Sequence, residues 1–479
     1  MNVVERRSLF RTVAAGTIAG LAGCVTGSDG SDGAGDEPNE TDGDGGTDGD
    51  SNESDGDSAV DEGVEPSTLE RRAREFVERL DAGETDAAYE LVTESFASQL
   101  PPGEMESFWE TQIRPAGDLE GFAAVEFRGH RDDGLAVVVA RGQFSEAAIR
   151  FEYAFAEGDI AEFVARPGGE WTPPSYADES ALSERDLTLE APDDCSIGAT
   201  LTRPASDAGG PGIVLVHGSG DQDRDETAGA NRTFKELAWG LATQGITSLR
   251  YDKRTVACDV DRTAATVDDI IVDDAVAAVE RLRGTDGVDD VFVAGHSLGG
   301  KFAPLIAERS DAAGVIMLAP SGVPVHEAIV RQQRHVLTLD GNLSEADEDA
   351  LADVAALAER IRTLDIGDDE VIDIAGGRGR PFWRTLQAYD HTATAAELDV
   401  PILLVQGGRD YLVTVEDDLA VWEDAIGDEP NVRIEVFDDL NHRFQPGTGQ
   451  SSPAEWTAPE NPVDERVVEA VADFVRDSR

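Results

Sequence analysis

The chain has 479 residues, and its 98 aspartates and glutamates against 39 lysines and arginines give a formal net charge of −59 at pH 7. Binding to nucleic acid depends on basic patches that meet the phosphates, so an acidic balance of this size excludes it. Lysine occurs only at Lys235, Lys253 and Lys301. A surface this acidic repels itself in dilute buffer, whereas 1 M salt screens charges beyond about 3 Å. The composition therefore predicts a halophilic protein.

Residues 1–24 contain the parts of an export signal in their usual order. Arg6 and Arg7 resemble a twin-arginine motif, although Glu5 stands where serine or threonine is usual. The apolar stretch 12–23 is too short to span a bilayer as a stable helix. It ends in Leu-Ala-Gly-Cys, which resembles a lipobox. We therefore expect a twin-arginine lipoprotein signal peptide, export from the cytoplasm, and anchoring to the membrane surface through a lipid on Cys24.

Two segments that differ in composition and hydrophobic pattern follow the predicted signal peptide. Residues 25–64 are mostly Gly, Ser, Asp, Glu, Asn and Thr, which cannot bury enough surface to fold, so we expect a disordered acidic linker. Residues 65–167 change from helical periodicity to strand-like alternation, which predicts a small α+β domain. This domain resembles a nuclear-transport-factor-2-like cone domain of unknown function. Substrate or surface binding and a purely structural spacer both remain open as its role.

Strands and helices alternate through residues 183–479. Short apolar runs such as 212–216, 291–294 and 402–405 are separated by helical patterns, which predicts a mostly parallel, doubly wound sheet with helices on both faces. Residues 322–398 interrupt the alternation with a helical insertion, at the place where folds of this kind carry a lid.

One serine lies among glycines at the end of a predicted strand. The run Val291–Ala294 leads into Gly-His-Ser-Leu-Gly-Gly, and a helical pattern begins at once. Glycines leave room for a sharp reversal of the backbone. The pattern is that of a nucleophile elbow, in which Ser297 is presented at the edge of the sheet.

A serine hydroxyl needs a base, and the base needs an orienting acid. In this type of fold the chain order is Ser, then Asp or Glu, then His. His442 is the last of the seven histidines and follows a strand-like run, so it is the predicted base. Asp410 comes directly after the strand 401–405 and is the predicted acid. Both would lie on the same rim of the sheet as Ser297.

The oxyanion of an acyl-transfer intermediate needs two N–H donors. The N–H of Leu298, directly after the nucleophile, is the first predicted donor. The second is the N–H of Ser219, in a His-Gly-Ser-Gly loop after an earlier strand. His217 and His296 adjoin these loops, and we expect them to brace the loops rather than to react.

Several motifs together resemble the α/β-hydrolase superfamily. The closest resemblance is to serine esterases of the dienelactone-hydrolase-like or acyl-thioesterase-like kind. It implies the triad Ser297, Asp410 and His442 and the oxyanion hole of Ser219 and Leu298. The chain departs from the pattern at Asp221, where relatives often have proline, and at Lys301 in the helix after the elbow. The motifs are LVHGSGDQDRDE, FKELAWGLATQGITSLRYDKRT, AGHSLGGKFAP, ILLVQGGRDYLVT and LNHRF.

These residues predict a serine hydrolase that cleaves small-molecule acyl esters through an acyl-enzyme, with no metal or organic cofactor. A thioesterase or a peptidase would use the same triad, because the shape of the pocket sets the leaving group. An alternative of another class is a non-catalytic lipoprotein that binds an envelope ligand. The oligomeric state stays undetermined, and Cys195 and Cys258 could pair outside the cell or remain as two buried thiols.

Overall fold

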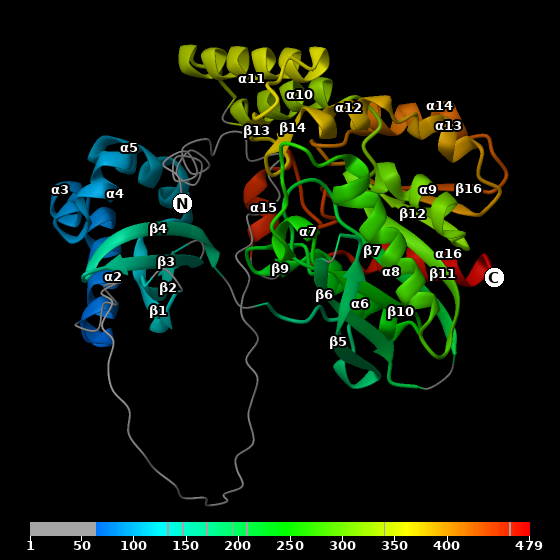
Figure 1. Cartoon of the computed structure of the whole chain (residues 1–479), viewed down its shortest axis with the longest axis horizontal. Coiled ribbons are helices and arrows are strands. Elements are labelled where there is room, and N and C mark those ends of the chain that lie inside the picture. The colour runs from blue at the N-terminus through cyan, green and yellow to red at the C-terminus, as the bar shows by residue number, and fades with distance from the viewer. Residues whose placement is uncertain are drawn as a thin grey trace, which may run out of the picture. The chain divides into compact units, whose positions relative to one another are not determined.

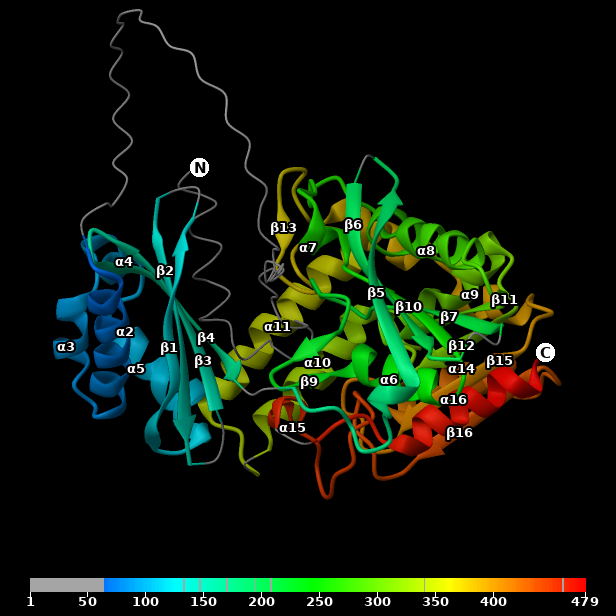
Figure 2. The same cartoon turned by 90° about the horizontal axis from the view of Figure 1, so that it is seen from below.

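The computed structural model describes residues 64–479 except 132–133, 146–147, 169–170, 194, 207–208, 340 and 459–460. The predicted signal peptide with Cys24 and nearly all of the predicted linker lie outside the described residues. The described chain divides into two compact units, one of which contains Arg166–Arg479 and the short segment Glu146–Ile149. The other contains the residues before Glu146 together with Arg150–Ala165. Figures 1 and 2 show both units.

The smaller unit is an α+β domain, as its pattern predicts. Its helices precede a four-stranded sheet of order β1-β2-β3-β4. Trp109 stacks on Phe151 with ring centroids 6.2 Å apart, and Phe163 meets both Phe151 and Phe76. These rings make an aromatic core between helices and sheet. The elements are α2 (Pro66–Asp81), α3 (Thr85–Ala88), α4 (Glu94–Gln99), α5 (Pro102–Phe108), β1 (Leu119–His130), β2 (Ala136–Phe144), β3 (Ala148–Ala156) and β4 (Asp159–Gly168).

The larger unit is built on an eight-stranded sheet of order β16-β15-β12-β11-β7-β10-β6-β5. The first six strands in this order, β16 to β10, pair in parallel with their neighbours. The strand β6 pairs antiparallel with both β10 and β5. The mostly parallel sheet is thus confirmed. The strands are β5 (Leu182–Ala191), β6 (Cys195–Pro204), β7 (Gly210–Val216), β10 (Thr247–Tyr251), β11 (Val288–His296), β12 (Gly314–Leu318), β15 (Ile402–Gly407) and β16 (Val432–Phe437).

Both faces of this sheet are covered, which explains why its central strands read as unbroken apolar runs. On β7, Ile213 and Leu215 pack with α6 and α16, while Val214 and Val216 pack on the other face with α8 and α9. This alternation follows from the two-residue period of a strand. The covering helices are α6 (Thr233–Thr243), α8 (Asp273–Arg283), α9 (Leu298–Ser310), α14 (Ala420–Ile426) and α16 (Glu465–Asp477).

Between β12 and β15 the chain forms the helical insertion. Its longest helix begins with a capping box, in which the hydroxyl of Ser344 accepts from the N–H of Asp347 while the Asp347 carboxylate accepts from the N–H of Ser344. The insertion contains α10 (Val325–Leu337), α11 (Glu345–Thr363), β13 (Val371–Ile372), β14 (Arg378–Gly379), α12 (Arg380–Ala388) and α13 (His391–Ala396). Smaller elements elsewhere are β8 (Thr227–Ala228), β9 (Asn231–Arg232), α7 (Arg254–Ala257) and α15 (Pro453–Thr457).

The two cysteines of the larger unit form a disulfide, the first of the two possibilities that the sequence leaves open. Cys195 begins β6 and Cys258 follows α7, 63 residues later. The bond therefore ties the antiparallel strand β6 to the segment that follows β10 and α7. Over the residues that the structure describes, no helix has the length and apolar character needed to cross a membrane.

Candidate active site

Ser297 stands in a strained turn between β11 and α9. Its φ of 55° and ψ of −116° lie in a region that residues with a side chain seldom adopt. Gly295 makes the turn possible, because a Cβ at that position would come within 2.7 Å of the Gly300 nitrogen. The Ser297 N–H donates to the Leu318 carbonyl at 2.8 Å, which fixes the turn to the neighbouring strand β12. The elbow is thus held by the centre of the sheet.

His442 and Asp410 meet, although 32 residues separate them. Nδ1 of His442 lies 2.7 Å from Oδ2 of Asp410, and both side chains are buried. The other carboxylate oxygen accepts from the N–H groups of Leu412 and Val413 at 2.8 and 2.9 Å. A carboxylate held in this way keeps the proton on Nδ1 and leaves Nε2 of the imidazole free to take a proton.

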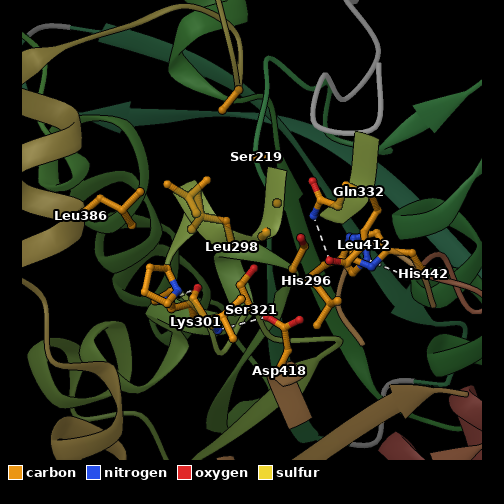
Figure 3. A pocket seen from close by; sticks show the side chains of 18 of the residues that line it. Ser219, His296, Leu298, Lys301, Ser321, Gln332, Leu386, Leu412, Asp418 and His442 are labelled. Atoms are coloured by element: carbon orange, nitrogen blue, oxygen red, sulfur yellow. Dashed lines mark hydrogen bonds between the residues drawn. The ribbon is translucent and has the colours of Figure 1, made fainter. Parts of the chain in front are cut away.

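Ser297 and His442 line the same cavity, of about 340 Å³, together with both predicted oxyanion donors, Ser219 and Leu298. Figure 3 shows Ser219, Leu298 and His442 around this space. The insertion contributes much of the remaining wall, including Phe382, Trp383, Leu386 and Tyr389. Trp383 and Tyr389 therefore reach the cavity as well as packing against the body of the fold. The wall is mostly apolar, as in pockets for small organic ligands.

The loop with Ser219 lies directly against the nucleophile. A Cβ on Gly218 would come within 3.1 Å of the Ser297 Cβ, so a side chain there would push the loop or the nucleophile by a few tenths of an ångström. The Gly218 N–H already donates to Oε1 of Glu226 at 3.1 Å, which makes it unavailable to a substrate. Its carbonyl accepts from Nζ of Lys253 at 2.6 Å. Both backbone polar groups of Gly218 are therefore fixed by buried side chains.

Glu226 joins the oxyanion loop to the loop of His442. Its Oε2 lies 2.9 Å from Nδ1 of His296, and Nε2 of that ring lies 3.0 Å from the His442 carbonyl. Both neighbours of the His296 ring accept hydrogen bonds, so the doubly protonated imidazolium fits the site. The Arg443 guanidinium also donates to the Glu226 carbonyl. His296 thus braces the catalytic loops, as expected. No sequence pattern singles out Glu226, so the sequence alone does not predict its role.

The charges of this pair stabilise each other. Burial alone would raise the pKa of Glu226, but the charge and hydrogen bond of His296 lower it to about 2. Burial likewise favours neutral His296, yet Glu226 raises its pKa above the usual 6.5. Burial and the nearby Arg378 guanidinium lower the pKa of Lys253 to about 7.

Elsewhere near the strand ends, Arg224 pairs with Asp252 at 2.6 Å and Arg254 with Asp274 at 2.5 Å, so these residues form ion pairs.

Among the residues of 64–479 that the structure describes, no group of three or more His, Cys, Asp or Glu side chains could hold a metal ion. The cavity brings together a strained serine, a carboxylate-oriented imidazole and two backbone N–H positions. That combination suits nucleophilic attack on an acyl carbon.

Glu226→Gln should destabilise the protein by about 3–5 kcal/mol, because it leaves His296 buried without its counter-charge. The carboxylate stabilises the fold above its unfolded pKa of 4.5 and loses that effect as the pH falls through 2. The imidazolium stabilises it below 6.5 and loses that effect as the pH rises through its raised pKa. The decrease in unfolding free energy caused by Glu226→Gln should therefore be greatest between pH 4.5 and 6.5. Chemical denaturation in molar salt measures it.

The exposed Glu469 on α16 offers a matched control, since Glu469→Gln removes a charge without a buried partner. If Glu226→Gln unfolds at the same denaturant concentration as Glu469→Gln throughout that pH window, the buried pair does not stabilise these loops.

Two protein families and a curated relative match this chain. Residues 212–445 match the family described as serine aminopeptidase, S33, and residues 73–163 match a family of unknown function, DUF3887. Esterase EstD of Thermotoga maritima is 33% identical over 402 residues, which are 83% of this chain and 93% of that protein.

Solved structures that match part of this chain include Est1E from Butyrivibrio proteoclasticus, at 19% identity and a TM-score of 0.40 over 61% of this chain and 98% of that one. The Pyrococcus furiosus esterase Pf2001 has 18% identity and a TM-score of 0.39 over 65% and 96%. The identity to EstD over most of both proteins decides the assignment: this chain belongs to the α/β-hydrolase family of serine esterases that includes EstD.

Proposed function

We propose that the protein hydrolyses carboxylic esters of small molecules, with Ser297 as nucleophile, His442 as general base and acid, and Asp410 as the group that orients His442. The observation that carries this assignment is the 2.7 Å contact between His442 and Asp410 beside a cavity that also holds the strained Ser297. The relationship to an esterase favours esters over other acyl compounds.

The reaction runs in two halves. His442 removes the proton of the Ser297 hydroxyl as the oxygen attacks the acyl carbon, and the carbonyl oxygen becomes an oxyanion. The N–H groups of Ser219 and Leu298 stabilise this charge, each contributing about 10²–10³ in rate. His442 then protonates the departing alcohol, and the acyl group stays on Ser297. A water molecule, activated by the same imidazole, releases the acid and restores the serine.

Ser297→Ala should abolish both ester hydrolysis and labelling by a fluorophosphonate, because the alanine has no oxygen to attack. Asp410→Asn should lower kcat by about 10⁴, since the imidazole loses the partner that fixes its tautomer. The measurements are p-nitrophenyl ester hydrolysis and gel fluorescence of the labelled chain in molar salt. Absence of labelling in the wild type would favour a ligand-binding lipoprotein. Faster turnover of acyl-CoAs or peptide amides than of esters would favour a thioesterase or a peptidase.

We also propose that the enzyme works in concentrated salt. The net charge of −59 supports this, since it must be screened for the chain to stay compact. Activity and cooperative unfolding should both weaken as molar salt is diluted, and they should return when salt is restored. Full activity in dilute buffer would contradict the proposal.

Finally, we propose that the enzyme is exported and anchored to the extracytoplasmic face of the cell membrane through a lipid on Cys24. The Cys195–Cys258 disulfide supports an oxidising compartment, where such bonds persist. In cells that produce the full chain, Cys24→Ser should move the enzyme from the membrane fraction to the medium, while Arg6→Lys with Arg7→Lys should retain it in the cytoplasm. Cytoplasmic wild-type enzyme with reduced cysteines would refute the export route.

A further inference from the structure

Lys301 is a buried amine in the wall of the catalytic cavity, and the acyl-transfer steps do not use it. It lies one helical turn after Ser297, whose carbonyl accepts from the Lys301 N–H at 3.1 Å. Residues four apart share one face of a helix, so the side chain follows the nucleophile along the same wall. Only 6% of Lys301 is exposed, and it lines the cavity with Ser297.

The ammonium group of Lys301 is poorly satisfied. Its only hydrogen-bond partners in the described part of the chain are the carbonyls of Gly322 and Val323, at the long distances of 3.5 and 3.4 Å. No carboxylate of the described chain lies within salt-bridge distance of Nζ. An ammonium has three donors, and burial without a counter-charge is costly.

Asp418, the carboxylate whose charge acts on Lys301, is already occupied by other groups. One of its oxygens accepts from the N–H groups of Gly322 and Val323 at 2.9 and 3.1 Å. The other accepts from the Arg331 guanidinium at 2.6 Å and from a backbone N–H at 3.0 Å. Asp418 thus neutralises Arg331 and shapes the loop after β12, and it attracts Lys301 only from a distance. Burial lowers the pKa of Lys301 to about 8, so the amine is still mostly charged at neutral pH.

A second polar group near Lys301 is weakly held. Nε2 of His391 is buried and lacks a hydrogen bond of normal geometry, although backbone groups of Gly322 and Tyr389 lie close to the ring, and His391 lines the same cavity. Burial and then the charge of Lys301 lower the pKa of His391 to about 4, so its ring is neutral at working pH. A neutral imidazole can donate one hydrogen bond to an acceptor. Nζ of Lys301 and Nε2 of His391 are therefore two weakly satisfied polar atoms in a mostly apolar wall.

The position of Lys301 relative to His442 indicates which part of an ester it faces. In the view of Figure 3, Lys301 and Leu386 are drawn on one side of Leu298, whereas His442, Gln332 and Leu412 are drawn on the other. His442 must reach the leaving oxygen to protonate it, so the alcohol lies on its side of the cavity. The acyl chain then extends past Leu298 toward Lys301.

We propose that Lys301 is a specificity-determining residue, and that the enzyme prefers esters whose acyl chain ends in a carboxylate, such as half-esters of dicarboxylic acids. The inference rests on the proposed ester hydrolysis and names its substrate class. The substrate carboxylate supplies the counter-charge that Lys301 lacks in the protein. The methylene groups of the acyl chain pack on Leu298, Leu386 and the neighbouring rings. A charge-assisted hydrogen bond formed out of water is stronger than a neutral one.

The test compares mono-p-nitrophenyl glutarate and adipate with p-nitrophenyl esters of unbranched acids of equal length, in molar salt at pH 7. The wild type should show a higher kcat/KM for one of the half-esters than for its neutral counterpart. Lys301→Met keeps the length of the side chain and removes the charge. It should lower kcat/KM for the half-ester by about 10- to 100-fold and leave or raise that for the neutral ester. Lys235→Met, away from this cavity, should change neither value.

Hydrolysis of the neutral ester shows that Lys301→Met has folded. If that variant does not fold, the wild type alone answers the question, because glutarate should slow fluorophosphonate labelling more than butyrate at equal ionic strength. The inference is wrong if the ratio of half-ester to neutral ester is the same in the wild type and in Lys301→Met, or if glutarate and butyrate protect equally. Failure of the wild type to hydrolyse any ester would instead refute the proposed function.

Discussion

The backbone conformation of Ser297 is the constraint on which the rest of the site depends. A residue with a side chain stays at a φ of 55° only when its surroundings hold it there. Here β11 lies between β7 and β12 at the centre of the sheet, and the Leu318 carbonyl receives the Ser297 N–H. The absence of a side chain at Gly295 lets strand and helix approach closely. The fold thus concentrates strain at one residue and spreads the compensating contacts over two strands and a helix.

Buried charges organise the surroundings of this turn. The Glu226–His296 pair connects the Gly218 N–H with the His442 carbonyl, so the predicted oxyanion loop and the predicted base are positioned by one ionic contact. Lys253 fixes the same loop through the Gly218 carbonyl. Two of the chain's three lysines, Lys253 and Lys301, are thus buried beside the cavity. The chain has almost no lysine on its surface, and these two lysines each place a compact positive charge at a buried position.

Much of the fold and of the site follows from sequence, because their signals are local or ordered along the chain. The alternation of apolar runs gives the parallel sheet, and glycines around a serine give the elbow. Asp410 and His442 follow from their order and from the strands before them. Glu226 could not be found in this way, since it contacts His296 across 70 residues and no spacing relates them. The cysteine pairing and the unsatisfied amine of Lys301 also depend on three-dimensional proximity, which a single sequence does not encode in any short pattern.

The central claim is that the elbow, the oxyanion loop and His442 converge on one acyl carbon. A crystal structure of the wild type inactivated by a fluorophosphonate, determined in molar salt, tests this most directly. We expect phosphorus bonded to the Ser297 oxygen and a phosphoryl oxygen about 2.7–3.1 Å from the nitrogens of Ser219 and Leu298. We also expect Nε2 of His442 within hydrogen-bond reach of the Ser297 oxygen. A phosphoryl oxygen turned away from both nitrogens, or an imidazole facing elsewhere, would contradict the claim.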